Sequence, residues 1–380
     1  MLIRSVSDSI SWFVLARMVF FVLLILVSFV IQQPTSIFLG SCFCAVYAIS
    51  FVSFSRTRLT GISFSIIFCF FCFPSILSMN HGLSSIFYML STIAIFFAAK
   101  SFCQHSFEEL LYCFRVVFGA SIFGIGFVLF TYWGHPEPLG EAIPGSSTNG
   151  IPSYLIVLQV TLTVSNYLAS KKLPIISPIL TLVVAFFGLG RGSLIISALI
   201  LLLSIFGNLL IRGILLRQRV FALLFIFVIV AIAMTNFDLL TDFVVDGTKL
   251  REGLVDPYRM EIFYQYINKI DAWSLIAGSD YAGTVISAQY DGNPHISLIR
   301  THAYFGVFVF LIVYLSPFLI FISNRPIVDK IIVFLLIDLI LFRALSEPIL
   351  FPTLLDFFYF CLFFMFFKDR VVVGQVSSVR

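Results

Sequence analysis

Residues 11–31 read SWFVLARMVFFVLLILVSFVI, a run in which Arg17 is the only charged side chain. A helix of about 20 apolar residues crosses the roughly 30 Å hydrocarbon core of a bilayer. Similar runs recur along the whole chain, which is 60% apolar and only 11% charged, whereas soluble domains carry about 25% charged residues. No water-soluble fold of 380 residues hides so much apolar surface, so the composition predicts a membrane protein.

The apolar runs are predicted to be helices. A lipid-exposed backbone must satisfy its own hydrogen bonds, and the runs lack the polar and apolar alternation typical of a membrane β-barrel. The sequence therefore predicts an all-α, polytopic transmembrane helical bundle, with residues 1–380 forming a single integral membrane domain. The first run is expected to be retained, because no small-residue cleavage site follows a short apolar core. We expect about twelve spans, at residues 11–31, 36–54, 60–77, 84–99, 113–132, 151–168, 173–190, 192–210, 219–236, 298–322, 327–342 and 353–367.

Basic residues gather in alternate loops. The positive-inside rule places those loops, and both chain termini, in the cytoplasm. Of the 23 lysines and arginines, 16 then lie inside and 7 outside. The rule does not explain the seven, which are Arg191, Lys249, Arg251, Arg259, Lys269, Arg300 and Arg343.

Two outer loops are long enough to carry a site. The larger, residues 237–297, is the one soluble-like piece of the chain and mixes acidic and basic residues with His295. Within it, Asp256 and Pro257 predict the start of a helix over 257–276 that lies against the outer membrane face and ends before Gly278. The smaller, residues 133–150, is rich in glycine and proline and carries His135, Glu137 and Glu141.

Arg191 is the first candidate site residue. It lies in the turn GLGRG of residues 188–192, between two apolar spans. The glycines remove bulk beside the guanidinium, so an anionic group can reach both it and the free amides of the next helix. The alternative is an arginine that snorkels to the interface. We favour anion binding, because a helix N-terminus disfavours a cation.

Arg259 and Arg343 are the next candidates. Arg259 lies in the first turn of the predicted loop helix, a position that disfavours a cation unless an anion is bound nearby. The alternative for Arg259 is a salt bridge to Asp256 or Glu261. Arg343 flanks the outer loop before the last span together with Glu347, and a mutual ion pair is the plainer interpretation of those two.

His295 is the candidate general base. It follows Asn293–Pro294, the expected cap and first turn of the span over 298–322, so its imidazole is predicted at the outer mouth of a helix. Arg300 and His302 come within the next two turns, and together with Glu347 they are accessory candidates. A histidine is most often structural, but one titratable base among displaced arginines is suited to general-base chemistry.

Several other chemistries lack their motifs. The chain has no P-loop, no HExxH and no paired aspartates that would hold a divalent ion on a nucleotide sugar, so we expect no metal site and no cofactor. All seven cysteines fall in apolar spans or in one inside loop, which argues against a disulfide framework or a zinc site. Transport stays open, although Asp338 is the one clear acidic residue within the spans, which is sparse for an ion relay.

Two segments resemble bacterial O-antigen polymerases and O-antigen ligases. The stretch GRGSLIISALI of residues 190–200 resembles the S-R-G-a-l-l-a-l stretch of these families, with Gly190 where serine is common. The large outer loop carries YR at 258–259 and Trp273, and ends in NPH at 293–295 followed by YFG at 304–306. This resembles the families' P-H-N … G loop end, with isoleucine at 296 where asparagine is frequent. The layout of about twelve spans with one dominant late outer loop also fits.

The resemblance implies a metal-independent, inverting glycosyltransferase of the GT-C type at the outer face of the bacterial inner membrane. Its partners would be an undecaprenyl-pyrophosphate-linked oligosaccharide, membrane lipid and a chain-length regulator protein, with no nucleic acid. Arg191 and Arg259, with Arg343, would bind the pyrophosphates, and His295 would activate the acceptor hydroxyl.

Polymerase and ligase share these motifs. We favour an O-antigen polymerase, since a phenylalanine-rich and divergent sequence suits a family whose members each handle a different glycan. The alternatives are an O-antigen ligase, which transfers the glycan to the lipid A core, and a flippase or other transporter of lipid-linked glycans. A flippase should carry basic residues through several spans, whereas here they gather at the outer face.

Overall fold

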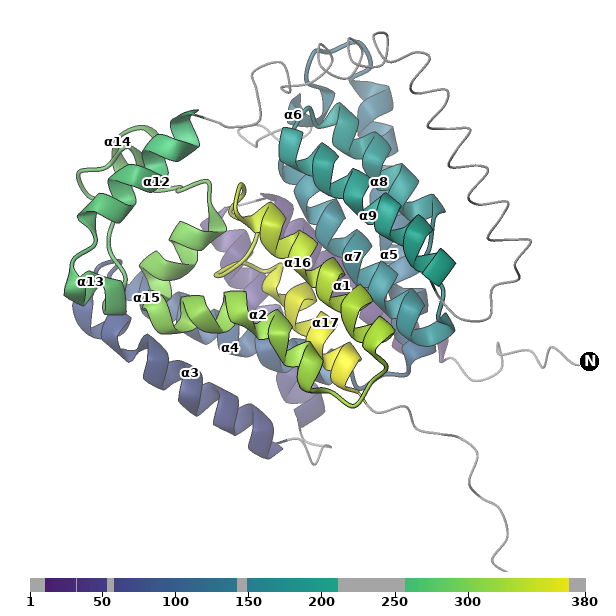
Figure 1. Cartoon of the computed structure of the whole chain (residues 1–380), viewed down its shortest axis with the longest axis horizontal. Helices are drawn as coiled ribbons and strands as arrows, with labels where there is room; N and C mark the ends of the chain where they lie inside the picture. Colours follow the sequence, from purple (N-terminus) through teal and green to yellow (C-terminus); the bar gives the residue numbers. More distant parts are fainter. Residues whose placement is uncertain (1–10, 32, 53–57, 142–148, 211–256, 369–380) are drawn as a thin grey trace, which may run out of the picture.

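The computed structural model of the chain describes residues 11–31, 33–52, 58–141, 149–210 and 257–368 (Figure 1). These residues fold as helices and connecting turns, with no strand in the described ranges, so the all-α prediction is confirmed for them. The predicted span at 219–236 and the first part of the large outer loop lie outside the described residues. Six segments are long and apolar enough to cross a membrane: α1 (Trp12–Ile31), α4 (Leu83–Phe102), α5 (Phe107–Thr131), α7 (Gly150–Ser170), α9 (Arg191–Leu210) and the run Ser297–Ile322.

The other predicted spans within the described residues are helices whose apolar part is shorter or whose sequence is more polar. For example, α16 carries Asp329, Lys330, Asp338 and Arg343 within 18 residues, and α17 has only 12 residues. The structure therefore supports a membrane protein with six candidate spans among its described residues. The remaining bundle helices are α2 (Pro34–Val52), α3 (Arg58–Ser78), α8 (Ile176–Phe187), α16 (Ile327–Ala344) and α17 (Asp356–Phe367).

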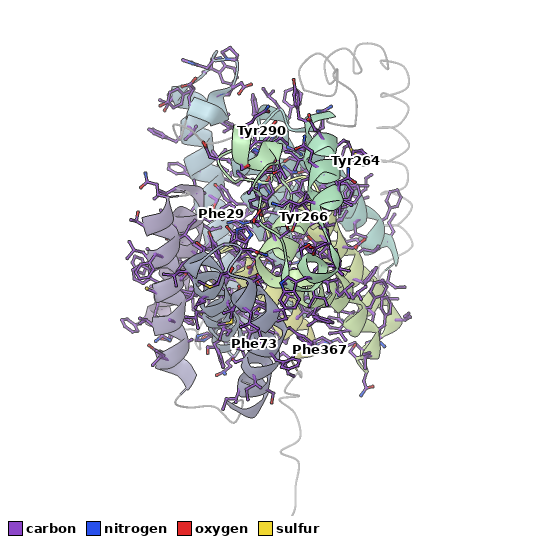
Figure 2. All side chains as sticks on the ribbon, turned by 90° about the vertical axis from the view of Figure 1, so that its left-hand side faces the viewer. Phe29, Phe73, Tyr264, Tyr266, Tyr290 and Phe367 are labelled. Carbon is purple, nitrogen blue, oxygen red and sulfur yellow. The ribbon has the colours of Figure 1, made fainter. Side chains whose placement is uncertain are left out.

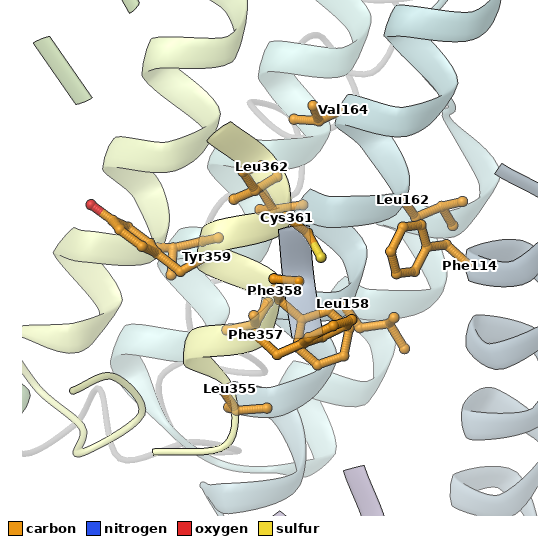
Figure 3. Packing of buried hydrophobic residues seen from close by; sticks show 14 of the residues in the cluster. Phe114, Leu158, Leu162, Val164, Leu355, Phe357, Phe358, Tyr359, Cys361 and Leu362 are labelled. Atoms are coloured by element: carbon orange, nitrogen blue, oxygen red, sulfur yellow. The ribbon is translucent and has the colours of Figure 1, made fainter. Parts of the chain in front are cut away.

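Helix α7 is the centre of the bundle. Every residue from Ile151 to Leu168 is buried, because α7 packs against α1, α5, α8, α9, α16 and α17. Figure 3 shows one of these contacts, in which Phe357 and Phe358 of α17 lie beside Leu158 of α7. Helix α7 is surrounded by other helices on all sides and has no solvated face, so its apolar and polar residues do not segregate to opposite faces. The apolar sequence of α17 fits its place beside α7 in the core.

Large apolar side chains also cover the outside of the bundle. On α5, Phe123, Phe127 and Phe130 are 79%, 65% and 81% exposed, and on α3 Phe70 is 72% exposed. Exposed apolar area on this scale marks a contact with lipid or protein rather than with water. The outer surface therefore agrees with the membrane class that the composition predicts.

The loops gather on two opposite faces. One, here called the lysine face, is held together by Lys171 with Asp329 and by Lys368, which donates to the carbonyl of Cys103. It joins the loops at 103–106, 171–175 and 323–326 to the end of α17. The other, the loop face, joins residues 79–82, 149–153, 188–192, 278–280 and 343–351. The basic loops that the structure describes thus lie on one face, as alternating spans require; which face is cytoplasmic stays a prediction.

The segment before α15 forms a small layer on the loop face. It contains α12 (Pro257–Lys269), α13 (Ala272–Ala277) and α14 (Val285–Gln289), which lie together at one side of the bundle in Figure 1. In Figure 2, Tyr264, Tyr266 and Tyr290 of this layer lie in the upper half, and Phe367 at the end of α17 lies in the lower half. Ile262, Tyr266 and Ile286 form its own small core.

The predicted single helix over 257–276 is wrong in one respect, because it is broken at residues 270–271. Asp271 is the reason: its carboxylate accepts a hydrogen bond from the Ser274 N–H at 2.7 Å, and the Ser274 hydroxyl accepts from the Asp271 N–H. This reciprocal cap starts α13 as a new helix. The same hydrogen bond from Ser274 lowers the pKa of Asp271.

Helix α15 (Ser297–Leu315) is kinked at Gly306, where φ is +78°, and continues into the 3₁₀ helix η3 (Ser316–Ile322). A Cβ at Gly306 would overlap the carbonyl oxygen of Ile276, and one at Gly278 would overlap that of Ala303. Helices α13 and α15 therefore meet backbone to backbone at two glycines that both have positive φ. Helix α13 is wedged into the bend of α15.

Candidate active site

Arg343 is the centre of a charged cluster on the loop face. It lies in the last turn of α16, is only 2% exposed, and donates to Ser153 of α7 at 2.8 Å and to Ser346 at 2.7 Å. Its guanidinium also forms an ion pair with Glu347 at 3.3 Å. The predicted pair of Arg343 and Glu347 is therefore present, and it is buried.

Glu347 bridges two arginines from distant parts of the chain. The same oxygen, Oε1, that pairs with Arg343 accepts a hydrogen bond from Arg259 of α12 at 3.1 Å. The Glu347 side chain is 9% exposed and that of Arg259 is 27% exposed. The salt bridge that the structure shows for Arg259 is with Glu347, which the alternative drawn from the sequence, a bridge to Asp256 or Glu261, did not name. Asp256 lies outside the described residues. Two cations and one carboxylate leave this cluster with an excess positive charge.

The N-terminus of α9 lies against the cluster. A Cβ at Gly192 would be 3.2 Å from a terminal nitrogen of Arg343 and 3.1 Å from the Ser346 hydroxyl. Gly190 packs still more closely on Asn149, which precedes α7: a Cβ there would be 1.7 Å from the Asn149 Oδ1. Arg191, the first residue of α9 and partly exposed, is thereby held next to Arg343. The glycines that flank Arg191 in the sequence are thus explained by close packing.

Three buried polar atoms in this region have no partner among the described residues. They are Nε of Arg343 and the hydroxyls of Ser193 and Ser197, the latter two both 0% exposed on α9. An unsatisfied buried donor costs about 1–3 kcal/mol, so such atoms mark a place where water or a ligand is bound. Serines in apolar helices are common, so the sequence offers no reason to select Ser153 or Ser197 as site residues. For Ser193 the one available signal was its place in the Gly-Ser step directly after Arg191.

An apolar groove opens beside the same turn. It has a volume of about 340 Å³ and lies between the end of α5, the loop at 132–138 and the end of α8. Its walls include Trp133, His135, Phe187 and Leu189, and Leu189 is separated from Arg191 by one residue. His135, for which the sequence decided no role, therefore lines an apolar groove rather than the charged cluster.

His295 lies directly before α15, next to the segment that carries Glu347. Its backbone has φ of +52°, a strained conformation for a non-glycine residue. The Asn293 side chain accepts from the His295 N–H at 3.0 Å, and the imidazole meets the Tyr290 ring edge-on at 4.9 Å. Two residues later, Ser297 donates to the carbonyl of Glu347 at 2.6 Å. The prediction that Asn293–Pro294 starts the helix is wrong: these residues form the turn that presents His295, and α15 starts at Ser297.

His302 has a structural environment. Nε2 lies 2.9 Å from the Leu275 carbonyl and Nδ1 lies 2.8 Å from the Tyr266 hydroxyl. A carbonyl only accepts, so Nε2 carries the proton and Nδ1 accepts from Tyr266. Burial raises the pKa of Tyr266, which keeps that hydroxyl protonated. Both nitrogens thus hold α12 and α13 to α15.

Arg300 points to another side of α15. Its guanidinium lies over the ring of Tyr88 in α4, with Cζ 5.8 Å from the ring centroid. Ser297 and Thr301 instead face residues 347–351, because Ser297 donates to Glu347 and Thr301 donates to the Phe351 carbonyl. Arg300 and Ser297 are three residues apart on α15, so they lie near one another on the helix but contact different elements, α4 and the segment of Glu347.

Taken together, the structure brings Arg259, Arg343 and Glu347 into direct contact, places the turn of Arg191 against them and places His295 in the adjoining segment. Such a cluster binds anions, since guanidinium groups and a helix N-terminus both favour phosphoryl oxygens. The described residues include no group of three metal-ligating side chains. Comparison with protein-family models, with curated proteins and with solved structures gives no match.

Proposed function

We propose that the protein is a membrane glycosyltransferase that polymerises undecaprenyl-pyrophosphate-linked oligosaccharides, as an O-antigen polymerase does. The observation that carries the proposal is the cluster of Arg259, Arg343 and Glu347, which lies at the N-terminus of α9 and beside the strained turn of His295. Three arginines that the topology rule does not explain thus meet at one face. The apolar groove beside Arg191 has the lining that a polyprenyl chain requires.

In the proposed reaction, Glu347 holds the arginines while the site is empty. A pyrophosphate carries more negative charge than a carboxylate and replaces it on Arg259, with the amides of α9 and Arg191 supplying further contacts. The acceptor hydroxyl oxygen attacks the anomeric carbon from the side opposite the leaving group. The bond from that carbon to the pyrophosphate oxygen breaks, and the arginines stabilise the charge that develops on the leaving lipid pyrophosphate. His295 takes the proton of the attacking hydroxyl.

The proposal includes the finer architecture: about twelve spans, a GT-C-type bundle, a bacterial inner-membrane location and both termini in the cytoplasm. The loop face would then be periplasmic. Reporter fusions after Lys368 and within the loop at Glu261 test this, with cytoplasmic and periplasmic signals expected respectively. A cytoplasmic signal at Glu261 would remove every site assignment.

An O-antigen ligase is the second candidate, because the same cluster would serve a donor lipid pyrophosphate. A transporter is less favoured by the structure: Asp338 is exposed on the outside of α16 rather than enclosed between helices, so it is poorly placed for an ion path.

Deletion of the gene separates the candidates. A polymerase mutant makes surface glycan with single repeat units, a ligase mutant accumulates lipid-linked polymer, and a flippase mutant keeps lipid-linked units on the cytoplasmic side. Purified protein with lipid-linked repeat units as the sole substrate should then form longer lipid-linked glycan. Absence of any elongation in that assay, with the protein folded, would refute the proposal.

A further inference from the structure

A second group of aromatic and polar side chains surrounds Arg300 on the loop face. Tyr88 lies under the guanidinium, and its ring meets that of Tyr304 at 4.8 Å, one turn further along α15. His81 stacks on Tyr304 at 4.2 Å and meets Tyr281 at 5.2 Å. Residues from separate parts of the chain therefore meet here: from the loop before α4 and α4 itself, from the loop before α14, and from α15.

Arg300 lacks an anionic partner in this group. Among the described residues its guanidinium forms no ion pair and donates no hydrogen bond, and its contact is the face of Tyr88. Asp356, a carboxylate that interacts electrostatically with Arg300, is buried and already accepts from the backbone N–H groups of Phe351 and Thr353. Asp280, beside Tyr281, is paired with Lys269. A partly buried guanidinium carries five N–H donors, and the described residues supply none of them with an acceptor.

Two buried hydroxyls nearby are also without partners among the described residues. The Tyr281 hydroxyl belongs to a residue that is 6% exposed, and the Ser85 hydroxyl to one that is 2% exposed. Burial raises the pKa of Tyr281 well above its usual range, so its hydroxyl is a neutral donor. Ser85 lies one turn before Tyr88 on α4 and so faces the same side of that helix.

The N-terminus of α4 ends in the same place. Its N-cap is Gly82, which has no side chain to accept from the first amides, and the first turn has no acidic residue. His81, which stacks on Tyr304, directly precedes Gly82. The first amides of a 20-residue helix, the Arg300 guanidinium and two orphan hydroxyls thus converge without an anion to receive them.

We propose that Arg300, Tyr281, Ser85 and the N-terminus of α4 form a second anion site, which binds the phosphoryl group of a lipid-linked ligand. The donor set is complementary to phosphate oxygens in number and charge. Tyr88 and Tyr304 provide an apolar wall for the part of the ligand next to the phosphoryl group.

The position of this site suggests its role, and this step rests on the proposed function. The site and the cluster of Arg259, Arg343 and Glu347 both border the first two turns of α15, the site through Arg300 and the cluster through Ser297, and His295 directly precedes those turns. A polymerase must hold two lipid pyrophosphates at once, one that leaves and one that stays on the acceptor. The cluster at Glu347 would take the leaving group, and the Arg300 site would take the pyrophosphate of the acceptor.

The test is a binding measurement on the purified full chain in detergent, with undecaprenyl pyrophosphate and inorganic pyrophosphate as separate probes. The wild type should bind two equivalents of the lipid probe. Arg300→Gln should abolish or weaken one of them by on the order of tenfold or more, because a charge-assisted contact is lost. Arg300→Lys should be intermediate. Tyr281→Phe and Ser85→Ala should each weaken the same equivalent several-fold, with unchanged or higher thermal stability without ligand, since each removes an unpartnered buried hydroxyl.

Two controls make the outcomes separable. Lys172→Gln, on the lysine face, should leave both equivalents unchanged, and Arg259→Gln should weaken the other equivalent only. Loss of inorganic pyrophosphate binding in Arg300→Gln means that the anion alone is recognised; loss of only the lipid probe means that the lipid contributes. Two unaltered equivalents in Arg300→Gln and Tyr281→Phe would overturn the second site, even if polymerisation is found. One equivalent that depends on Arg300 and none on Arg259 would support the second site while counting against the proposed function.

Discussion

Glu347→Gln tests whether the cluster on the loop face is both a buried ion pair and a binding site. The substitution keeps the shape of the side chain but removes the charge that Arg343 and Arg259 share. Arg343 is 2% exposed and would keep only neutral partners, its two serines and the amide oxygen of the new side chain, so the cost should approach the roughly 3–5 kcal/mol found when one partner of a buried pair is removed. Arg259→Gln should cost about 1 kcal/mol or less, because Arg259 is 27% exposed.

The double variant Arg343→Met with Glu347→Leu separates stability from function. Replacing both charges with apolar side chains should recover most of the loss, since such replacements are often neutral or stabilising. The thermal unfolding of purified protein and its abundance in the membrane measure the first effect, and the length distribution of surface glycan measures the second. We expect a stable double variant that makes only single repeats.

Two results would refute this reasoning. If Glu347→Gln is as stable as the wild type, Arg343 does not depend on the ion pair that the structure shows. If the stable double variant makes glycan of normal length, the cluster holds the fold together and the pyrophosphate is bound elsewhere.

Three further predictions concern the wedge of α13, the proposed catalytic groups and metals. Gly306→Ala should destabilise the docking of α13 by more than the roughly 1–3 kcal/mol of a strained φ, because the new Cβ would also overlap the Ile276 carbonyl. Gly283→Ala is the control: Gly283 also has positive φ but open space around it, so only the conformational cost is expected. Limited proteolysis measures the stability of both variants. Arg191→Lys and His295→Ala should keep normal abundance in the membrane but lose most polymerisation activity. The rate should fall about a hundredfold or more where the general base is lost. Normal long-chain glycan from both variants would show that these residues only anchor the protein at the membrane interface. Polymerisation by purified protein should survive EDTA, because arginines are proposed to stabilise the leaving group, and loss that magnesium restores would contradict that mechanism.

The main helices were predictable because they depend on local composition. The long apolar runs predict α1, α5 and α9 to within a few residues, apart from α5 starting earlier at the capping box of Ser106 and Glu109. The alternation of basic loops anticipates which loops share a face. Both signals come from the requirement that apolar residues meet lipid and basic residues meet one side of it.

The departures from the sequence prediction have tertiary causes. The break at Asp271 is local and was missed because Ser274 is a less familiar partner than glutamate in a reciprocal cap. The late start of α15 follows from Ser297, whose hydroxyl is used by Glu347 and Leu350 fifty residues away. The kink at Gly306 depends on where α13 packs, which no window of sequence around Gly306 contains.

The candidate site was only half visible in the sequence for the same reason. Arginines on the wrong side of the topology rule identify Arg191, Arg259 and Arg343 one by one, but not that Glu347 is shared by two of them. The sequence named His302 as an accessory candidate, and only the contacts with Tyr266 and Leu275 show that its nitrogens are occupied.

The wedge of α13 links these observations. His302 and the two close glycine contacts fix the first turns of α15 to α13. Those turns carry Arg300, which contacts α4, and Ser297, which holds the Glu347 segment. A change at the wedge therefore alters the distance between the two proposed anion sites and the orientation of His295 together. Under the proposed function, polymerisation would depend on all three at once, while folding depends on the bundle around α7. Variants at the contact between α13 and α15 that still reach the membrane should consequently make shorter glycan while their abundance in the membrane stays normal. Tyr266→Phe, which removes one hydrogen bond to His302, is the mildest such variant and should show shorter glycan at normal abundance.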